Sequence, residues 1–252
     1  MPDLLRVSSG ANAIAVLAYP PRRARGVAIV AGHGYSSSKQ NLDLLCAFLA
    51  SHGFSVYSLD FPGHKLGATG GFLASADDLI AAMTAVVHVA RDRSAGPVYA
   101  LGHSMGAVTA LCAAARDPAI AGAISIATGH GRPQALQALA FRGAVDLRSS
   151  YVDGRSLPEL ADEWAPLLEG ALPRLAGRPA LFVAAERDAM VAPASVRELY
   201  DRAPEPKTFA TVASDHTSAG DNARGAVLAW LNERHPRTAG APVDAVHAEG
   251  AR

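Results

Sequence analysis

The sequence predicts an α/β fold in which a mostly parallel sheet of eight strands is covered by helices on both faces. Short apolar runs of strand length alternate along the chain with longer segments of helical periodicity. Half of the 252 residues are hydrophobic and only 18% are charged, so the chain can bury a large core. The length suits a single large α/β domain.

The first half of the chain alternates regularly between strand and helix. Residues 4–8 and 13–19 are predicted as two opening strands, and Gly10 between them indicates a hairpin. The run 26–31 is apolar throughout, as expected of a strand buried on both faces. Further strands are predicted at 54–59, 97–101 and 121–127, and helices at 41–52, 76–91 and 105–116.

The alternation breaks between residues 130 and 177, where prolines interrupt short helical stretches. It resumes with strands at 179–185 and 207–212 and helices at 195–202 and 219–233. The residues after the last helix lack periodicity, which indicates a disordered tail. We therefore divide the chain into a first core segment (1–129), a small helical cap (130–177), a second core segment (178–234) and a tail (235–252).

Composition excludes several classes of function. Lys and Arg total 23, as do Asp and Glu, and no basic run is present, which argues against a nucleic-acid partner. No apolar stretch reaches the roughly 18 residues that a membrane span needs. The nine histidines have no metal-ligand spacing. We predict neither a metal nor another cofactor.

The two cysteines bear on the compartment. Cys46 and Cys112 lie in predicted helices without Cys-x-x-Cys spacing, so we interpret them as buried free thiols, which fit a reducing compartment. The apolar segment 11–19 is similar to the core of a signal peptide. However, Asp3 precedes it, and the segment makes a good second strand. We expect a cytoplasmic protein.

A candidate nucleophile follows the strand at 97–101. Residues 102–106 read Gly-His-Ser-Met-Gly, which is the pattern G-x-S-x-G, and a predicted helix begins at once. A serine on so tight a turn has a strained backbone, so the residues two positions away on either side must lack side chains. We predict that Ser104 is a nucleophile; the alternative is a glycine-rich loop with an incidental serine.

A serine hydroxyl needs a base to remove its proton. His216 follows the strand at 207–212, which places it at the same sheet edge as Ser104. Four other histidines lie in helices or near the tail and do not suit this role: His52, His88, His235 and His247. His216 is therefore the candidate base.

The base needs an acid that orients its ring. Asp188 lies beyond the strand at 179–185, in a loop from which it can reach His216. Glu186 is closer to the strand end, and Asp215 is adjacent to His216 and points away from it on an extended loop. Asp188 is therefore the candidate acid.

Together these motifs resemble the α/β-hydrolases, from the first predicted strand to the last helix. The chain order Ser104, Asp188, His216 is that of the family. Residues 32–35 (Gly-His-Gly-Tyr) and 60–64 (Asp-Phe-Pro-Gly-His) add to the likeness, which is greatest to the lysophospholipase, monoacylglycerol lipase and carboxylesterase branch. Lys65 stands where that branch often has a glycine.

The resemblance also implies an oxyanion hole. Attack by Ser104 creates a negative oxygen that needs two N–H donors. One is the backbone N–H of Met105 at the helix start, and the resemblance assigns the other to Tyr35. We interpret His33, Asp60 and His64 as structural. Residues predicted to contact substrate are Gly34, His103, His130, Trp164 and Met190.

The predicted activity is hydrolysis of carboxylic esters through a covalent acyl-enzyme, with a small-molecule ester as substrate. The same residues could serve a thioesterase, an acyltransferase, or an amidase or aminopeptidase. A non-catalytic binding protein of this fold would usually lack one of the three residues. A dehalogenase would need Asp at position 104, and a redox enzyme would need G-x-G-x-x-G after the first strands. No motif indicates the acyl chain length or the oligomeric state.

Overall fold

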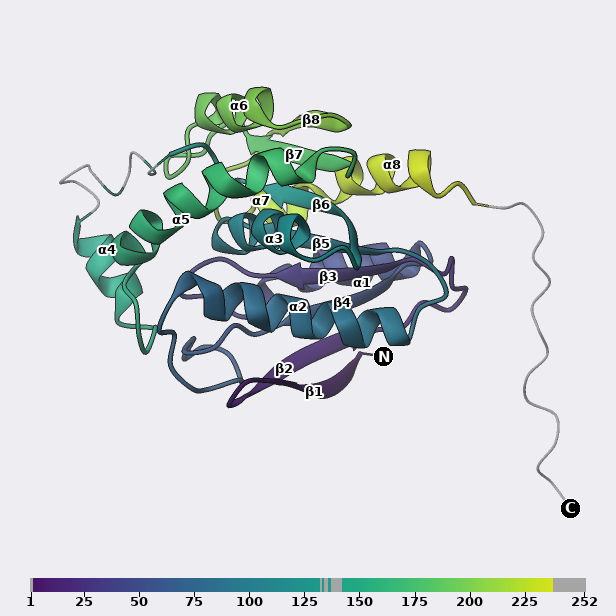
Figure 1. Cartoon of the computed structure of the whole chain (residues 1–252), viewed down its shortest axis with the longest axis horizontal. Helices are drawn as coiled ribbons and strands as arrows, with labels where there is room; N and C mark the ends of the chain where they lie inside the picture. The colour runs from purple at the N-terminus through teal and green to yellow at the C-terminus, as the bar shows by residue number, and fades with distance from the viewer. Residues whose placement is uncertain (1, 132, 134–135, 137–141, 238–252) are drawn as a thin grey trace, which may run out of the picture.

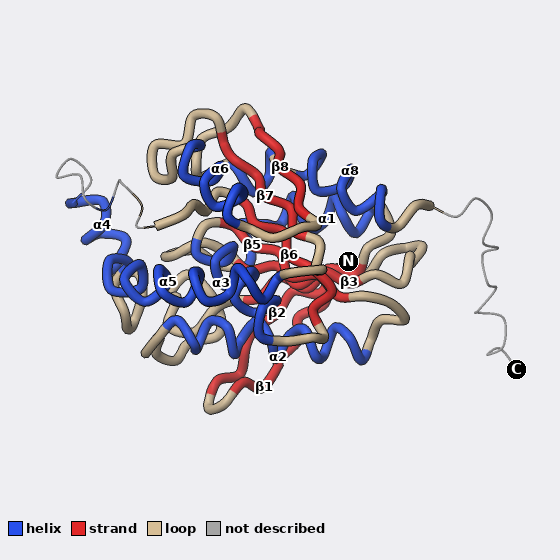
Figure 2. Tube along the Cα trace, turned by 45° about the horizontal axis from the view of Figure 1, so that its top comes forward, coloured by secondary structure: helices blue, strands red, loops and turns tan. Residues whose placement is uncertain are grey.

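The computed structural model describes residues 2–131, 133, 136 and 142–237. Eight strands form one sheet in the order β1-β2-β4-β3-β5-β6-β7-β8 (Figures 1 and 2). The strands are β1 Asp3–Ser9, β2 Asn12–Tyr19, β3 Ala28–Gly32, β4 Ser55–Leu59, β5 Val98–His103, β6 Ile120–Ile126, β7 Ala180–Ala185 and β8 Lys207–Val212. Only β2 runs against the others, because it pairs antiparallel with both β1 and β4. The predicted sheet is confirmed.

Helices cover both faces of the sheet, as predicted. One face packs against α2, α3, α5 and α6, and the other against α1, α7 and α8 (Figure 1). The helices are α1 Asp43–Ser51, α2 Ala76–Asp92, α3 Met105–Arg116, α4 Arg142–Ser149, α5 Leu157–Ala171, α6 Pro193–Arg202, α7 Ala219–Asn222 and α8 Arg224–Arg234. The predicted helix at 219–233 is thus two helices. Gly220 and Gly225 flank the break, and both weaken a continuous helix.

The apolar runs of the sequence become the central strands. Every residue of β3 and of β5 is buried, which explains why these strands read as continuous apolar runs. Full burial of a large aliphatic side chain contributes about 1.5–3 kcal/mol to stability. Cys46 and Cys112 are buried and unpaired, and burial raises the pKa of each thiol to about 12.

The connection between β6 and β7 holds α4, α5 and the 3₁₀ turn η4 Leu172–Leu175. A capping box begins α5: the backbone N–H of Ser156 donates to Glu159 Oε2 at 2.8 Å. Lys65, in the loop after β4, pairs with Asp153 at 3.0 Å and ties that loop to the segment between α4 and α5.

Two sequence-based expectations extend beyond the described part of the chain. The predicted tail at 235–252 lies outside it from residue 238 onward, and the predicted cap at 130–177 lacks residues 132, 134–135 and 137–141. Within the described residues, every helix is too short or too polar to cross a membrane.

Candidate active site

Ser104 occupies the turn between β5 and α3 in a backbone conformation that few residues adopt. Its φ of 54° and ψ of −115° lie in a strained region for a residue with a side chain. The Ser104 N–H donates to the carbonyl of Ile126 at 2.8 Å, which ties the turn to the end of β6. The strained turn lifts the hydroxyl above the end of the sheet.

Glycines make this turn possible. A Cβ atom on Gly102 would collide with the backbone of Gly106, and a Cβ atom on Gly106 would collide with the carbonyl of Gly32 on β3. The G-x-S-x-G pattern therefore has a steric cause: α3 begins directly against the ends of β5 and β3. This close approach brings the first turn of α3 beside Ser104.

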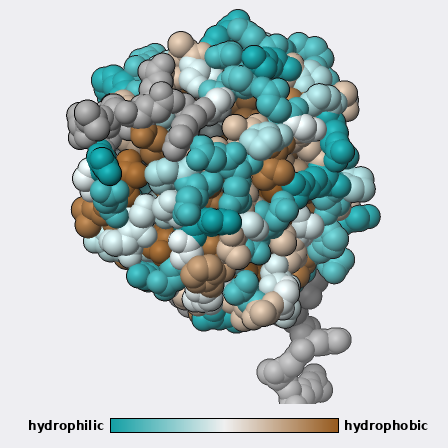
Figure 3. Space-filling model, turned by 60° about the vertical axis from the view of Figure 1, so that its left-hand side comes forward, coloured by the Kyte–Doolittle hydropathy of each residue, from teal (hydrophilic) through white to brown (hydrophobic). Residues whose placement is uncertain are grey.

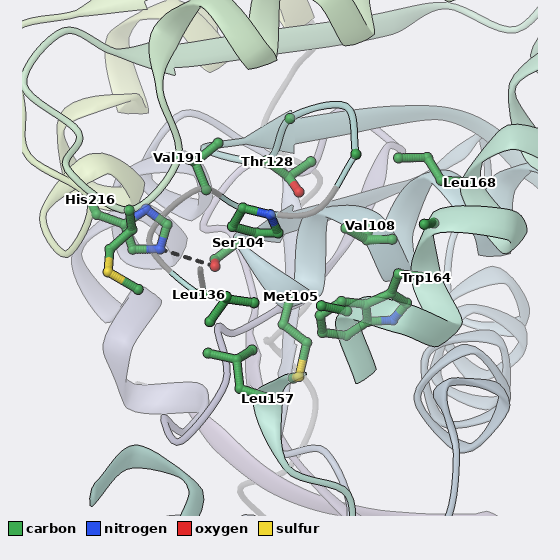
Figure 4. A pocket seen from close by; sticks show the side chains of 16 residues that line it. Ser104, Met105, Val108, Thr128, Leu136, Leu157, Trp164, Leu168, Val191 and His216 are labelled. Atoms are coloured by element: carbon green, nitrogen blue, oxygen red, sulfur yellow. Dashed lines mark hydrogen bonds between the residues drawn. The ribbon is translucent and has the colours of Figure 1, made fainter. Parts of the chain in front are cut away.

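Ser104, His216 and Asp188 form one hydrogen-bonded chain. His216 Nε2 lies 3.0 Å from Ser104 Oγ, an interaction that Figure 4 marks with a dashed line. His216 Nδ1 lies 2.8 Å from Asp188 Oδ2. With the proton on Nδ1, the imidazole donates to the carboxylate and accepts from the serine hydroxyl. The structure thus brings together the three residues that the sequence singles out.

Asp188 is held firmly in the loop after β7. Its side chain is only 1% exposed. Oδ1 accepts hydrogen bonds from the backbone N–H groups of Met190 and Val191, both at 2.8 Å, which leaves Oδ2 for His216. The carboxylate therefore has a fixed orientation. Asp215, by contrast, is exposed and accepts from the Ser218 N–H at 2.8 Å, so it has no part in this chain.

His103 holds the backbone of His216 through a hydrogen bond. Its Nε2–H donates to the backbone carbonyl of His216 at 2.7 Å. Burial lowers the pKa of His103 to about 4, so the ring is neutral near pH 7 and its single ring proton serves this bond. His103 is predicted as a substrate contact; in the structure it also positions the loop that carries the candidate base.

The loop after β3 is fixed by buried polar groups. His33 donates from Nδ1 to the Gly34 carbonyl at 2.8 Å and accepts at Nε2 from the Phe61 N–H at 3.1 Å. Burial lowers the pKa of His33 to about 3 and that of His64 to about 4. Asp60 pairs with Lys39 at 2.5 Å. These contacts agree with a structural interpretation of all three motif residues, His33, Asp60 and His64.

Both candidate oxyanion donors lie near Ser104, because Met105 follows it in the chain and Tyr35 lines a cavity together with it. Met105 is the first residue of α3, where backbone N–H groups point outward without partners in the helix. Gly34 packs so closely that a Cβ atom on it would lie 3.5 Å from Ser104 Cβ. Tyr35 follows, and its ring is anchored by a hydrogen bond from the hydroxyl to the Arg155 carbonyl at 2.9 Å.

Two cavities meet at Ser104. The first, which we call the apolar pocket, has a volume of about 60 Å³ and is enclosed by α5 and the loops after β6 and β7 (Figure 4). Its side chains are mainly hydrophobic: Met105, Val108, Leu136, Leu157, Ala161, Trp164, Ala165, Leu168, Met190 and Val191.

The second cavity, which we call the polar pocket, has a volume of about 540 Å³. It lies between the loop after β3 and α4, and it shares Ser104, Leu157, Met190 and His216 with the apolar pocket. Its polar lining residues are Tyr35, Ser36, Ser37, Ser38, Asn41, His103, Arg148 and Thr217. A substrate bound across Ser104 would place one half in each pocket.

Most predicted substrate contacts line these pockets. Trp164 lines the apolar pocket, Gly34 and His103 line the polar pocket, and Met190 lines both. His130 lines neither pocket: its ring lies between Glu169, at 2.5 Å, and Glu198, at 3.1 Å, and joins α5 to α6.

Sequence reasoning missed Arg148 and the serines at 36–38. The serines directly follow the predicted oxyanion donor Tyr35, and this position in the sequence indicates that they lie near the site. Arg148 lies in the irregular region, and no local pattern distinguishes it from other surface arginines. Among the described residues, no group of three His, Cys, Asp or Glu side chains is arranged to hold a metal ion.

Comparison with known proteins gives a family and a fold. The model of the family described as serine aminopeptidase, S33, matches residues 23–175, more than half of the chain. No curated protein has significant sequence similarity to this chain.

Similar solved structures include the monoacylglycerol lipase of Paleococcus ferrophilus (18% identity, 87% of this chain and 98% of that chain, TM-score 0.65). Est1E from Butyrivibrio proteoclasticus, with bound ferulic acid, is 16% identical (91% and 98%, TM-score 0.69). A thioesterase domain from the curacin biosynthetic pathway is 15% identical (92% and 99%, TM-score 0.67). At these identities the likeness concerns the fold.

Proposed function

Because this chain belongs to the serine aminopeptidase S33 family and has the α/β-hydrolase fold, we propose that it is a serine hydrolase that cleaves carboxylic esters. This membership confirms the resemblance to α/β-hydrolases. The observation that carries the proposal is the hydrogen-bonded chain from Ser104 through His216 to Asp188.

In the proposed reaction, Ser104 Oγ attacks the ester carbonyl while His216 Nε2 takes the hydroxyl proton. Asp188 holds the imidazole in the required tautomer and stabilises its protonated form. The N–H groups of Met105 and Tyr35 stabilise the oxyanion, and each such donor supplies about 3 kcal/mol. His216 then delivers the proton to the leaving alcohol. Water, activated by the same ring, releases the acid from the acyl-enzyme. No metal or cofactor takes part.

The lining of the pockets favours ester cleavage over aminopeptidase activity. An aminopeptidase must bind the positively charged α-amino group of its substrate, for which a carboxylate is the natural partner. Among the described residues that line the two pockets there is no carboxylate, and Arg148 is cationic. The polar pocket would therefore repel an ammonium group. The mainly apolar character of the first pocket suits the acyl chain of an ester.

Thioester cleavage by the same residues is the second candidate, and one of the structural neighbours is described as a thioesterase domain. The apolar pocket would accept the acyl group of either substrate. A thioester series therefore belongs in the test.

Two further proposals concern the cap and the location. Residues 130–177 act as a cap over the acyl group, which is supported by the α5 side chains that line the apolar pocket.

We assign the protein to the cytoplasm, which is supported by its two buried, unpaired cysteines.

The test is a matched series of a butyryl oxygen ester, thioester and anilide, with wild type and Ser104→Ala. We expect the oxygen ester to be cleaved fastest, and Ser104→Ala to reduce kcat at least about 10³-fold, since the nucleophile is lost. A fluorophosphonate should label the wild type but not Ser104→Ala. The exposed Ser51 at the end of α1 provides the control variant Ser51→Ala, which should retain labelling. Activity that survives in Ser104→Ala would exclude the proposed nucleophile.

A further inference from the structure

The polar pocket contains a cation without a carboxylate partner. Arg148 is an exposed residue near the end of α4, and its side chain makes one hydrogen bond to the described residues, a long one of 3.4 Å from Nη1 to Ser36 Oγ. No ion pair within the described chain includes Arg148. The other cations of this region are already neutralised: Lys39 by Asp60 and Lys65 by Asp153. The guanidinium of Arg148 therefore remains available to a ligand.

Hydroxyl groups line the same pocket as this cation. Ser37 Oγ is buried and has no hydrogen-bond partner among the described residues, although Ser37 lines the polar pocket. A buried hydroxyl without a partner is costly, and the cost is removed when the Ser37 side chain turns toward a ligand that accepts its hydrogen bond. Ser38 and Asn41 line the same wall. The wall offers donors, the cation offers charge, and both are suited to a negatively charged oxygen.

Among the described residues that line the polar pocket there is no carboxylate that would compete with a ligand for Arg148. The pocket's two other titratable rings, His103 and Tyr35, are neutral near pH 7 because burial lowers the pKa of His103 to about 4 and raises the pKa of Tyr35. His216 belongs to the candidate triad. On the outer face at this end of the molecule, apolar side chains are scattered among hydrophilic ones (Figure 3).

Water access decides which half of the ester enters this pocket. The acyl group stays bound while the alcohol leaves, and the attacking water then takes the place of the alcohol. The polar pocket, with a volume of about 540 Å³, is larger than the apolar pocket of about 60 Å³ and has more polar lining residues, so it suits the alcohol and the water that replaces it. The polar pocket is thus the alcohol side.

We propose that the polar pocket recognises a carboxylate on the alcohol half of the ester, through Arg148 and the hydroxyl wall of Ser37 and Ser38. The proposal rests on the proposed esterase function and adds the substrate class: short acyl esters of alcohols that carry an acidic group. A single guanidinium balances a single negative charge, and its two parallel N–H groups match the two oxygens of a carboxylate.

The test compares two butyrate esters of similar size that differ in charge, one of 3-hydroxybenzoate and one of 3-hydroxybenzamide. The measured quantity is the ratio of their kcat/KM values divided by the ratio of their rates of hydrolysis by hydroxide, which cancels any general loss of active enzyme and corrects for the different leaving groups. We expect a ratio of about five in favour of the carboxylate for wild type, since a partly exposed ion pair contributes up to about 1 kcal/mol. The ratio should fall to about one in Arg148→Gln, and below one in Arg148→Glu.

The matched control is Arg142→Gln, which removes an exposed arginine from the same helix at a position outside the pocket lining. It should keep the wild-type ratio. Raising the salt concentration should lower the wild-type ratio through screening but leave the ratio of Arg148→Gln unchanged. A wild-type ratio near one, or a ratio that Arg148→Gln does not alter, overturns the proposal. Failure to cleave either ester would instead count against the proposed esterase function.

Discussion

At the scale of single residues, the position of His216 is set from three sides. Asp188 holds Nδ1, Ser104 Oγ lies at Nε2, and His103 holds the backbone carbonyl. The first two contacts are expected of any Ser-His-Asp arrangement. The third comes from the residue next to the nucleophile, so the same turn that exposes Ser104 also anchors the loop of its base.

This arrangement predicts different effects for two substitutions of His103. His103→Leu removes the N–H donor, so the His216 loop should shift and kcat should fall about 10–100-fold, because small displacements of catalytic groups are costly. His103→Gln can place an amide N–H where Nε2 was and should retain most of the activity. Steady-state kinetics on a butyrate ester, with circular dichroism as a check of folding, would measure both. Equal losses in the two variants would contradict a role for the hydrogen bond.

At the scale of elements, α3 and α5 build the site together. α3 begins directly after the Ser104 turn and has the candidate oxyanion donor at its first residue, and α5 lies across α3 and closes the apolar pocket (Figures 1 and 4). Trp164 and Leu168 of α5 face this pocket on one side of the helix, because residues four apart lie on the same face. The small residues Ala161 and Ala165 of α5 line the same pocket, so larger side chains at these positions would make the acyl site shallower.

Ala165→Leu should shorten the acyl chain that the enzyme accepts. Ala165 lines the apolar pocket and is only half-buried, so the larger side chain fills the pocket without disturbing the core. We expect kcat/KM for a hexanoate ester to fall about tenfold relative to an acetate ester, since each methylene in an apolar pocket changes binding by that order. Gly170→Ala is the control, because its new methyl group would meet no atom within 4 Å. An unchanged preference in Ala165→Leu would show that the acyl chain lies elsewhere.

At the scale of the whole molecule, buried neutral histidines link stability to pH. His33, His64 and His103 are buried, and burial lowers their pKa values to about 3, 4 and 4 from the ordinary value of 6.5. In the unfolded chain they bind protons below pH 6.5, whereas in the folded protein they do not until about pH 4. The stability of the folded protein therefore has its full value, as far as these three rings are concerned, above pH 6.5, and it decreases as the pH falls from 6.5 to about 4.

The free energy of unfolding should therefore be lower at pH 5 than at pH 7.5, by at least about 2 kcal/mol. Urea denaturation followed by fluorescence at the two pH values would measure this difference. His64→Gln removes one of the three titrating rings, so the difference should become smaller in that variant, whatever its absolute stability. Equal stability of the wild type at the two pH values would contradict the assignment of neutral rings.

Much of the fold follows from local patterns. The eight strands and the helices that flank them appear in the sequence because buried strands need continuous apolar runs and helices need apolar residues at a period of 3.6. The division of the last helix at Ala223 was not predicted, since the apolar periodicity continues across the break. The 3₁₀ turn η1 Lys39–Leu42 was not predicted either; it overlaps the start of the predicted helix at 41–52. The backbone N–H of its first residue, Lys39, donates to the Asp60 carboxylate.

The amino-acid sequence by itself determines that a serine, an acid and a histidine each follow a parallel strand. Because parallel strands end at one edge of their sheet, these three residues come to the same edge. The sterics of the glycines around Ser104 are equally local. Only the tertiary structure decided that His103 supports His216, that the cleft divides into an apolar and a polar pocket, and that Arg148 lines the polar pocket together with the serines at 36–38. These features depend on how α4 and α5 pack across the sheet edge, and such long-range packing leaves no periodic trace in the chain.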